Sequence, residues 1–194
     1  MKEHLITQIE KYTPFNRQEE LDKKTILYFL RNFNDIFYRE NLIAHMTASC
    51  WLVNQSCDKV VMAYHNLYDS YSWLGGHCDG DENPLNVAIK EAKEESGLTN
   101  IKALTNDIFS LEVLAVDHHI KNNSFVPSHL HLNLTYLLQA IDSHPLKIKE
   151  DENREIGWFS LDEAINISKE EAFKIHIYPK LNQKLDLFLK ERRK

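Results

Sequence analysis

The chain has 194 residues and a mass of 22.8 kDa, which suits one domain of ordinary size or a domain with an extension. With 43% hydrophobic residues it can bury a sizeable core, whereas a mean hydropathy of -0.45 and the lack of a long apolar run argue against a membrane span. The net charge of -6, from 23 basic and 29 acidic residues, disfavours generic nucleic-acid binding through a basic surface. These values predict a soluble globular protein.

The three cysteines, Cys50, Cys57 and Cys78, give neither an even number for disulfides nor a Cys-x-x-Cys pair. Their pattern fits a reducing compartment and argues against a structural zinc site. The first ten residues alternate charged and apolar side chains and lack the pattern of a signal peptide. We therefore expect a cytoplasmic protein with no membrane partner.

Apolar side chains recur near a 3.6-residue period from the start of the chain to about residue 40, which predicts helices there. Asn16, followed three residues later by Glu19, has the pattern of a helix start. Beyond residue 44, runs rich in β-branched and aromatic residues predict short strands, at 47–53, at 59–65 and near 71–74. The third of these runs into a glycine-rich acidic loop and then into one strongly marked helix.

After that helix, two stretches of alternating apolar residues, 108–117 and 129–141, are predicted to pair as strands. Trp158 and Phe159 indicate a last short strand. Three helix starts follow it, at Ser160 with Glu163, at Ser168 with Glu171, and at Pro179. Mixed strands between helices predict an α/β/α layered fold, with residues 1–40 as a helical extension of a main domain at 41–194.

Acidic residues and glycines concentrate between residues 75 and 98. This segment contains four of the five glycines of the chain, and it has six acidic residues but only two lysines. Asn83 as N-cap, Pro84 in the first turn and Gly97 as the stop predict a helix from Pro84 to Ser96. Its packing face is predicted to contain Leu85, Ala88, Ile89, Ala92 and Ser96, with Glu91, Glu94 and Glu95 on the opposite side.

Like charges three and four residues apart destabilise a bare helix by about 0.2 to 0.5 kcal/mol per pair. Hard divalent cations such as Mg²⁺ or Mn²⁺ would offset this repulsion, because they prefer carboxylate oxygens, and diphosphate groups are natural partners of such ions. The alternative is a solvated acidic face that is balanced by the neighbouring Lys90 and Lys93.

The run GHCDGDENPLNVAIKEAKEESGL, residues 76–98, resembles the signature box of the Nudix hydrolases. That box reads G, five residues, E, seven residues, then R-E-U-x-E-E-x-G-U, where U is aliphatic. The positions that match it are Gly76, Glu82, Glu91, Glu94, Glu95, Gly97 and Leu98. Lys90 stands where the family has arginine and lacks the planar bidentate fork of that residue, and Ala92 replaces a larger aliphatic residue. The strand order and the segment around Trp158 extend the resemblance to about residues 44–165.

The resemblance implies a Nudix-like α/β/α sandwich with a mixed sheet, and hydrolysis of a nucleoside diphosphate derivative by water attack on a metal-activated phosphorus. A nucleotide sugar such as ADP-ribose is the expected kind of substrate. The resemblance also implies catalytic roles for Glu91, Glu94, Glu95 and Lys90, and metal ligation of Mg²⁺ or Mn²⁺ by the Gly76 carbonyl and the three helix glutamates. Glu82 would brace the loop. The general base varies within the family, and its candidates here are Glu95, Glu112, Glu152 and Glu155.

One predicted strand carries a polar row, because His129, His131 and Asn133 alternate with leucines. This row is expected to bind substrate. Hydrogen-bonded or exposed histidines are a simpler interpretation than a metal site of His129 with His131, or of His118 with His119.

Two other functions stay open. Type I isopentenyl diphosphate isomerases share the fold and use a metal with a catalytic cysteine and glutamate, for which Cys78 is the candidate. A nucleotide-sensing module that has lost turnover is the third possibility, and Lys90 is the feature in its favour. The intact box favours hydrolysis. The predicted N-terminal helices could form a lid or the contact of a homodimer.

Overall fold

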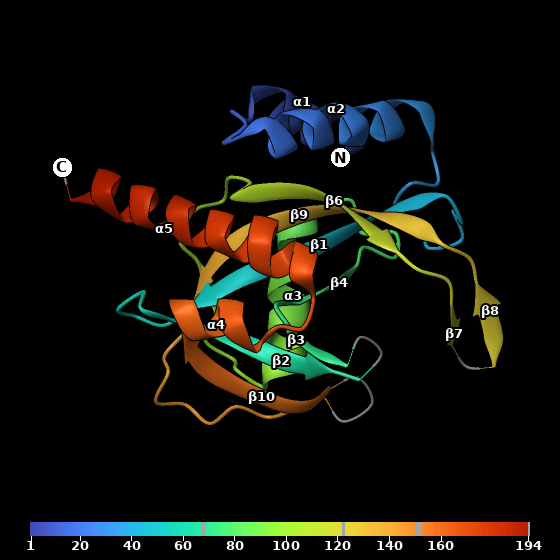
Figure 1. The fold of residues 1–194 in the computed structure, drawn as a ribbon. Coiled ribbons are helices and arrows are strands. Elements are labelled where there is room, and N and C mark those ends of the chain that lie inside the picture. Colours follow the sequence, from blue (N-terminus) through green and yellow to red (C-terminus); the bar gives the residue numbers. More distant parts are fainter. Residues whose placement is uncertain (67–68, 122, 150–152, 194) are drawn as a thin grey trace. The chain divides into compact units, whose positions relative to one another are not determined.

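The computed structural model describes residues 1–66, 69–121, 123–149 and 153–193 (Figure 1). Eight strands of these segments form one sheet, in which β10, β2, β1, β9 and β5 are consecutive neighbours. Beside this path, β3 pairs with β2, β4 with β1, and β6 with β9. A mixed sheet with helices, preceded by N-terminal helices, confirms the predicted α/β class.

The chain divides into two compact units, and the long strands β1 (Ala44–Val53) and β9 (His129–Gln139) contribute to both. The first unit contains Met1–Ser49, Gly75–Ala88 and Asn106–Tyr136, and the second contains the remaining segments. Further elements of the first unit are α1 (Lys2–Lys11), α2 (Arg17–Asn32), most of β4 (Leu74–His77), β6 (Ser110–Val116), and the hairpin of β7 (His119–Lys121) with β8 (Ser124–Val126). The predicted helical stretch at the start of the chain is therefore two helices, and helix α2 ends at Asn32.

Helix α2 begins as its sequence predicts, because the Asn16 side chain accepts a hydrogen bond of 3.0 Å from the Glu19 amide. Polar side chains of α2 then form hydrogen bonds with backbone groups on the outer edge of β6, and the other edge of β6 pairs with β9. The Gln18 amide donates to the Leu111 carbonyl at 3.2 Å, and the Val113 amide donates to Asp22 at 2.9 Å. An edge strand with unpaired backbone groups is a template for unwanted pairing, so these contacts protect it.

A buried polar cluster ties the two N-terminal helices to β6. Glu19 is fully buried and accepts a hydrogen bond of 2.6 Å from the Tyr12 hydroxyl. The Ser110 hydroxyl lies 2.8 Å from a Glu19 oxygen and 2.5 Å from a Glu112 oxygen. Burial, followed by the charge of Glu19, raises the pKa of Tyr12, so the phenol remains a donor. The cluster joins the extension to the sheet through hydrogen bonds that a sequence pattern does not display.

The second unit contains the remainder of β1 and β9 and the other strands of the sheet. These strands are β2 (Lys59–His65), β3 (Ser70–Ser72), β5 (Lys102–Ala103) and β10 (Asn153–Ser160). The prediction of a strand at 59–65 is confirmed. The predicted strand near 71–74 is instead two strands, because the chain changes its pairing partner from β2 to β1 around Trp73. Strand β10 is longer than Trp158 and Phe159 indicated.

Three helical segments close the second unit: α4 (Leu161–Ile167), the π-helical turn η1 (Phe173–Ile177) and α5 (Tyr178–Arg192). The capping box of Ser160 with Glu163 is confirmed. The capping box predicted for Ser168 with Glu171 is wrong, because the buried Ser168 hydroxyl accepts from the Glu170 amide at 3.3 Å instead. Pro179 lies in the first turn of α5, as predicted. Among the residues that the structure describes, no helix combines the length and apolar character needed to cross a bilayer.

The buried cluster predicts that Ser110→Ala destabilises the chain, because it removes a donor between two buried carboxylates. We expect the free energy of unfolding, measured by urea denaturation, to fall by about 1 to 3 kcal/mol. The matched control is Ser143→Ala at an exposed position, which should change it by less than about 0.5 kcal/mol. Equal effects of the two substitutions would contradict the role of the cluster.

Candidate functional site

Helix α3 (Pro84–Ser96) has the bounds that its sequence predicts. At its start, the Asn83 side chain accepts a hydrogen bond of 3.4 Å from the Asn86 amide, and the Asp81 side chain accepts one of 2.8 Å from the Asn83 amide. At its end, Gly97 has a φ of +69°, a conformation that L side chains rarely adopt. The signals at both ends therefore fix which residues are helical.

The buried face of α3 differs from the predicted one. Glu91 and Glu95 are only 8% and 4% exposed, whereas the Glu94 side chain is 43% exposed. Leu85 and Ile89, which were expected on the packing face, are only half-buried. The expectation that all three glutamates lie opposite the packing face is thus wrong for Glu91 and Glu95. Burial of two carboxylates is costly unless charge or hydrogen bonds offset it.

Two lysines form ion pairs with the glutamates of α3. The Lys90 ammonium lies 3.6 Å from a Glu91 oxygen and 3.8 Å from a Glu94 oxygen. Lys149 lies 3.9 Å from the other oxygen of Glu94. Burial, followed by the charges of Glu95 and Glu91, raises the pKa of Cys50 well above its ordinary value, so that thiol stays neutral. The α3 carboxylates thus lie in a group of charged side chains that includes Lys90 and Lys149.

Carboxylate oxygens fit the Mg²⁺ or Mn²⁺ that the Nudix box implies, because hard cations prefer such ligands. Lys90 contacts two of the glutamates, as the family arginine would, but at distances beyond those of charged hydrogen bonds. The donor set on α3 is therefore suited to a hard divalent cation.

The loop carboxylate Glu82 contacts the N-terminal extension. It accepts a hydrogen bond of 2.7 Å from the Lys2 amide in the first turn of α1. This hydrogen bond lowers the pKa of Glu82. A pocket of about 220 Å³ lies beside this contact, lined by residues of α1, the box loop and the start of α3. Glu82 therefore joins the box loop to α1, a contact that sequence reasoning did not find.

The polar row predicted on β9 is largely buried. Asn133 is 1% exposed, and its side-chain oxygen accepts hydrogen bonds from Thr47 at 3.0 Å and Ser49 at 2.9 Å. Its amide nitrogen donates to Glu112 at 3.0 Å and to Thr135 at 3.2 Å. The amide of Asn133 thus makes four hydrogen bonds within the protein, which connect β1, β6 and β9.

The candidates for the general base have very different surroundings. Glu112 is fully buried and accepts hydrogen bonds from Ser110, Asn133 and Thr135. Glu155 is exposed on β10 and accepts a hydrogen bond of 2.5 Å from the Tyr71 hydroxyl. Glu152 lies outside the described residues. Glu95 alone of the four belongs to α3 together with the other glutamates of the box.

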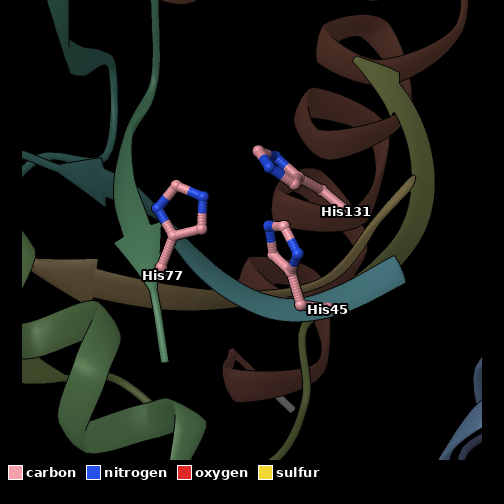
Figure 2. Close-up of side chains that lie close together, drawn as sticks. All are labelled: His45, His77 and His131. Atoms are coloured by element: carbon pink, nitrogen blue, oxygen red, sulfur yellow. The ribbon is translucent and has the colours of Figure 1, made fainter. Parts of the chain in front are cut away.

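Three histidines from different strands converge in the first unit, as Figure 2 shows. His45 comes from β1, His77 from β4 and His131 from β9, and one ring nitrogen of each lies within 4.8 Å of the others. Sequence reasoning named His131 but missed His45 and His77. The position of His77 directly after Gly76 was a signal that could have drawn attention to it.

Gly75 in β4 permits the close approach of this strand to β1. A Cβ atom there would lie 2.5 Å from the Ser49 hydroxyl and 2.6 Å from the Ala48 carbonyl oxygen. Such distances are far below van der Waals contact, so a side chain would force the backbones apart. Gly75 therefore positions the strand that carries Gly76 and His77.

The NUDIX domain model matches residues 44–181, so the chain belongs to this family. A curated relative from Lactococcus lactis subsp. cremoris (strain MG1363), named "Probable DHNTP pyrophosphohydrolase", is 26% identical over 163 residues, which is 84% of this chain and 90% of the relative. The chain is thus a NUDIX pyrophosphohydrolase, an enzyme that acts on phosphorus-containing anhydrides.

Solved structures support the same fold. A binary complex of the Ap4A hydrolase of C. elegans has a TM-score of 0.54 at 17% identity, and the match covers 75% of this chain and 98% of that one. The dihydroneopterin triphosphate pyrophosphohydrolase of E. coli has a TM-score of 0.51 at 14% identity, with coverage of 75% and 95%. At these identities, the likeness concerns the fold alone.

The close approach of β4 to β1 predicts that Gly75→Ala lowers the midpoint of thermal unfolding, by the equivalent of about 1 to 3 kcal/mol. Gly157→Ala is the matched control, because a Cβ at that position meets only ring atoms of Phe159, at 3.0 and 3.1 Å, and a side chain can move. A midpoint for Gly75→Ala that is no lower than that of the control would show that this approach is not tightly constrained.

Proposed function

We propose that the chain hydrolyses the diphosphate linkage of a nucleoside diphosphate derivative with Mg²⁺ or Mn²⁺ as the cofactor. The observation that carries this proposal is the grouping of three carboxylates on one helix, because Glu91, Glu94 and Glu95 all lie on α3 within five residues. An anionic substrate would be repelled by these glutamates alone, so a divalent cation must accompany it.

We assign the metal ligands to Glu91, Glu94 and Glu95, with the Gly76 carbonyl as the further ligand that the box implies. A bound cation would neutralise phosphate charge, polarise the phosphorus centre and lower the pKa of the attacking water. Glu95 is the proposed general base, whose carboxylate accepts the proton of that water. Lys90 supplies a positive charge beside Glu91 and Glu94, at 3.6 and 3.8 Å from one oxygen of each.

The buried hydrogen bonds of Asn133 and Glu112 favour structural roles for both residues over contact with substrate or water. Substrate contacts of His129 and His131 remain a prediction. So do the cytoplasmic location and a homodimer contact through residues 1–40.

Two classes of substrate are candidates for this reaction. A nucleotide sugar such as ADP-ribose is the expectation from the Nudix box. The relative named for DHNTP favours a pterin triphosphate as the second candidate, because the match extends over 84% of this chain. Both substrates present a phosphoanhydride bond next to a bulky organic group, so the proposed chemistry is the same for the two.

A substrate panel distinguishes these candidates. Purified protein with Mg²⁺ is incubated with ADP-ribose, diadenosine polyphosphates, nucleoside triphosphates and dihydroneopterin triphosphate, and the products are separated by chromatography. We expect cleavage at a phosphoanhydride bond, with ADP-ribose giving AMP and ribose phosphate. Addition of a chelator should abolish turnover. Undiminished turnover in the chelator would contradict the metal dependence.

Glu94→Gln and Glu95→Gln should each lower kcat/KM by a factor of about 10² to 10⁴, because each removes a negative charge from the proposed metal and proton-transfer site. The matched control is Glu191→Gln, an exposed glutamate near the end of α5, which should keep the wild-type rate. Circular dichroism checks that the variants are folded. Rates near wild type in both α3 variants would refute the assignment.

The alternative functions make different predictions. An isomerase would convert isopentenyl diphosphate and lose this activity in Cys78→Ser, whereas a hydrolase should keep its turnover in that variant because the buried Cys78 has no step in the proposed reaction. A sensing module would bind nucleotides in calorimetry without forming a product. Isomerisation or product-free binding would replace the proposed function.

A further inference from the structure

The histidines of the first unit form a second set of donor atoms that the proposed reaction does not use. Ring centroids of His45 lie 5.0 Å from those of both His77 and His131, and the rings of His77 and His131 are 4.9 Å apart (Figure 2). A fourth ring, that of His129, lies 4.8 Å from His45. Several imidazoles this close together repel one another once protonated, so the cluster favours neutral rings with lone pairs.

His45 presents one nitrogen without a partner. Its Nδ1 lies 3.1 Å from the Asn41 carbonyl oxygen, which can only accept a hydrogen bond, so Nδ1 carries the proton. In the neutral ring, Nε2 then has a lone pair. The residue is 4% exposed, and Nε2 is buried with no hydrogen-bond partner in the described part of the chain. An imidazole held by a carbonyl through one nitrogen, with the other nitrogen unused, is the arrangement of a metal-ligating histidine.

His129 orients His131 in a similar way. The Nδ1 atom of His129 lies 2.8 Å from the Pro127 carbonyl oxygen and therefore carries the proton of the neutral ring. Its Nε2 atom accepts from Nε2 of His131 at 3.2 Å, which leaves a lone pair on Nδ1 of His131. The hydrogen bonds of His45 and His131 thus leave one ring nitrogen of each with a lone pair that can bind a metal ion.

We propose that His45, His77 and His131 bind a divalent transition-metal ion of the zinc class, with no glutamate of α3 among its ligands. Imidazole nitrogens suit Zn²⁺ and its neighbours, whereas Mg²⁺ and Mn²⁺ prefer oxygen ligands. His129 is the positioning residue that fixes the ring of His131. Three nitrogen ligands leave one position of a tetrahedral ion for water or another small ligand.

The geometry requires only small adjustments. With metal–nitrogen bonds of about 2.1 Å, the ligand atoms around a tetrahedral ion lie about 3.4 Å apart. One ring nitrogen of each histidine lies within 4.8 Å of one from each of the others, so rotations of the rings that bring the ligand nitrogens about an ångström closer would complete the site. The nearby Arg39 does not present an uncompensated positive charge, because its Nε donates to Asp79 at 2.8 Å.

Cobalt binding tests the site, because Co²⁺ accepts the ligands of Zn²⁺ and its visible absorption reports tetrahedral nitrogen coordination. Protein treated with a chelator and dialysed is titrated with Co²⁺ in a large excess of Mg²⁺, which competes at carboxylate sites. We expect one Co²⁺ per chain with a tetrahedral spectrum, and Zn²⁺ should displace it. Binding should also raise the thermal midpoint, because a ligand of the native state stabilises it.

Substitutions identify the ligands. His45→Gln, His77→Gln and His131→Gln should each weaken Co²⁺ binding more than about 100-fold, and His129→Gln by about 10- to 100-fold, as for a second-layer partner. His144→Gln, at an exposed loop histidine, is the matched control and should bind as wild type does. Because His45 is buried, folding of each variant is checked by circular dichroism, and the half-buried His77 and His131 keep the test decisive if His45→Gln fails to fold.

Glu94→Gln separates this proposal from the proposed function, since it should impair hydrolysis but leave the Co²⁺ stoichiometry and spectrum unchanged. Co²⁺ binding that survives in both His77→Gln and His131→Gln but disappears in Glu94→Gln would place the ion on α3 and overturn the histidine site. Absence of Co²⁺ binding to the wild-type chain in Mg²⁺ would overturn it as well.

Discussion

Negative charge held in a buried position is the constraint on which the proposed chemistry depends. Moving a carboxylate out of water costs several kcal/mol even after the protein relaxes, and α3 places Glu91 and Glu95 in that position together. The contacts of Lys90 and Lys149 lie between 3.6 and 3.9 Å, and partly exposed ion pairs of this kind contribute little. In the proposed function, a divalent cation would bring positive charge to these carboxylates, and the same cation would allow an anionic diphosphate to approach them.

The ends of α3 could be predicted from the sequence because they are local. Asn83, Pro84 and Gly97 act through the backbone within one turn, and the capping box of α4 is equally local. The buried face of α3 could not be predicted, because a helical projection counts apolar residues as buried and polar ones as exposed. Glu91 and Glu95 violate that assumption, because both are buried. Local pattern and function conflict most often at functional sites, which agrees with the metal-binding role proposed for these two glutamates.

Long-range contacts account for the other errors. The separation of β3 from β4 follows from a change of pairing partner, and the capping role predicted for Ser168 is lost because its hydroxyl faces other partners in a buried position. The change of partner and the contact of Ser168 with Ser70, at 3.3 Å between their hydroxyl oxygens, both join residues far apart in the sequence. The histidine cluster also depends on long-range contacts. Alternation along β9 places His129 and His131 on one face, but only the pairing of strands brings His45 and His77 beside them.

The two donor sets differ in the way that metal selectivity requires. The oxygen atoms on α3 are charged and hard, whereas the imidazoles are neutral and of intermediate softness, so Mg²⁺ and a zinc-class ion would not exchange freely between them. The absence of a cysteine pair argued against structural zinc, but that argument concerns only thiolate sites. A metal site made of histidines requires no cysteine, so the spacing of the cysteines does not bear on it. Such a site requires neutral imidazole rings whose lone pairs are fixed in position. The carbonyls of Asn41 and Pro127 fix them by holding the ring proton on Nδ1 of His45 and of His129.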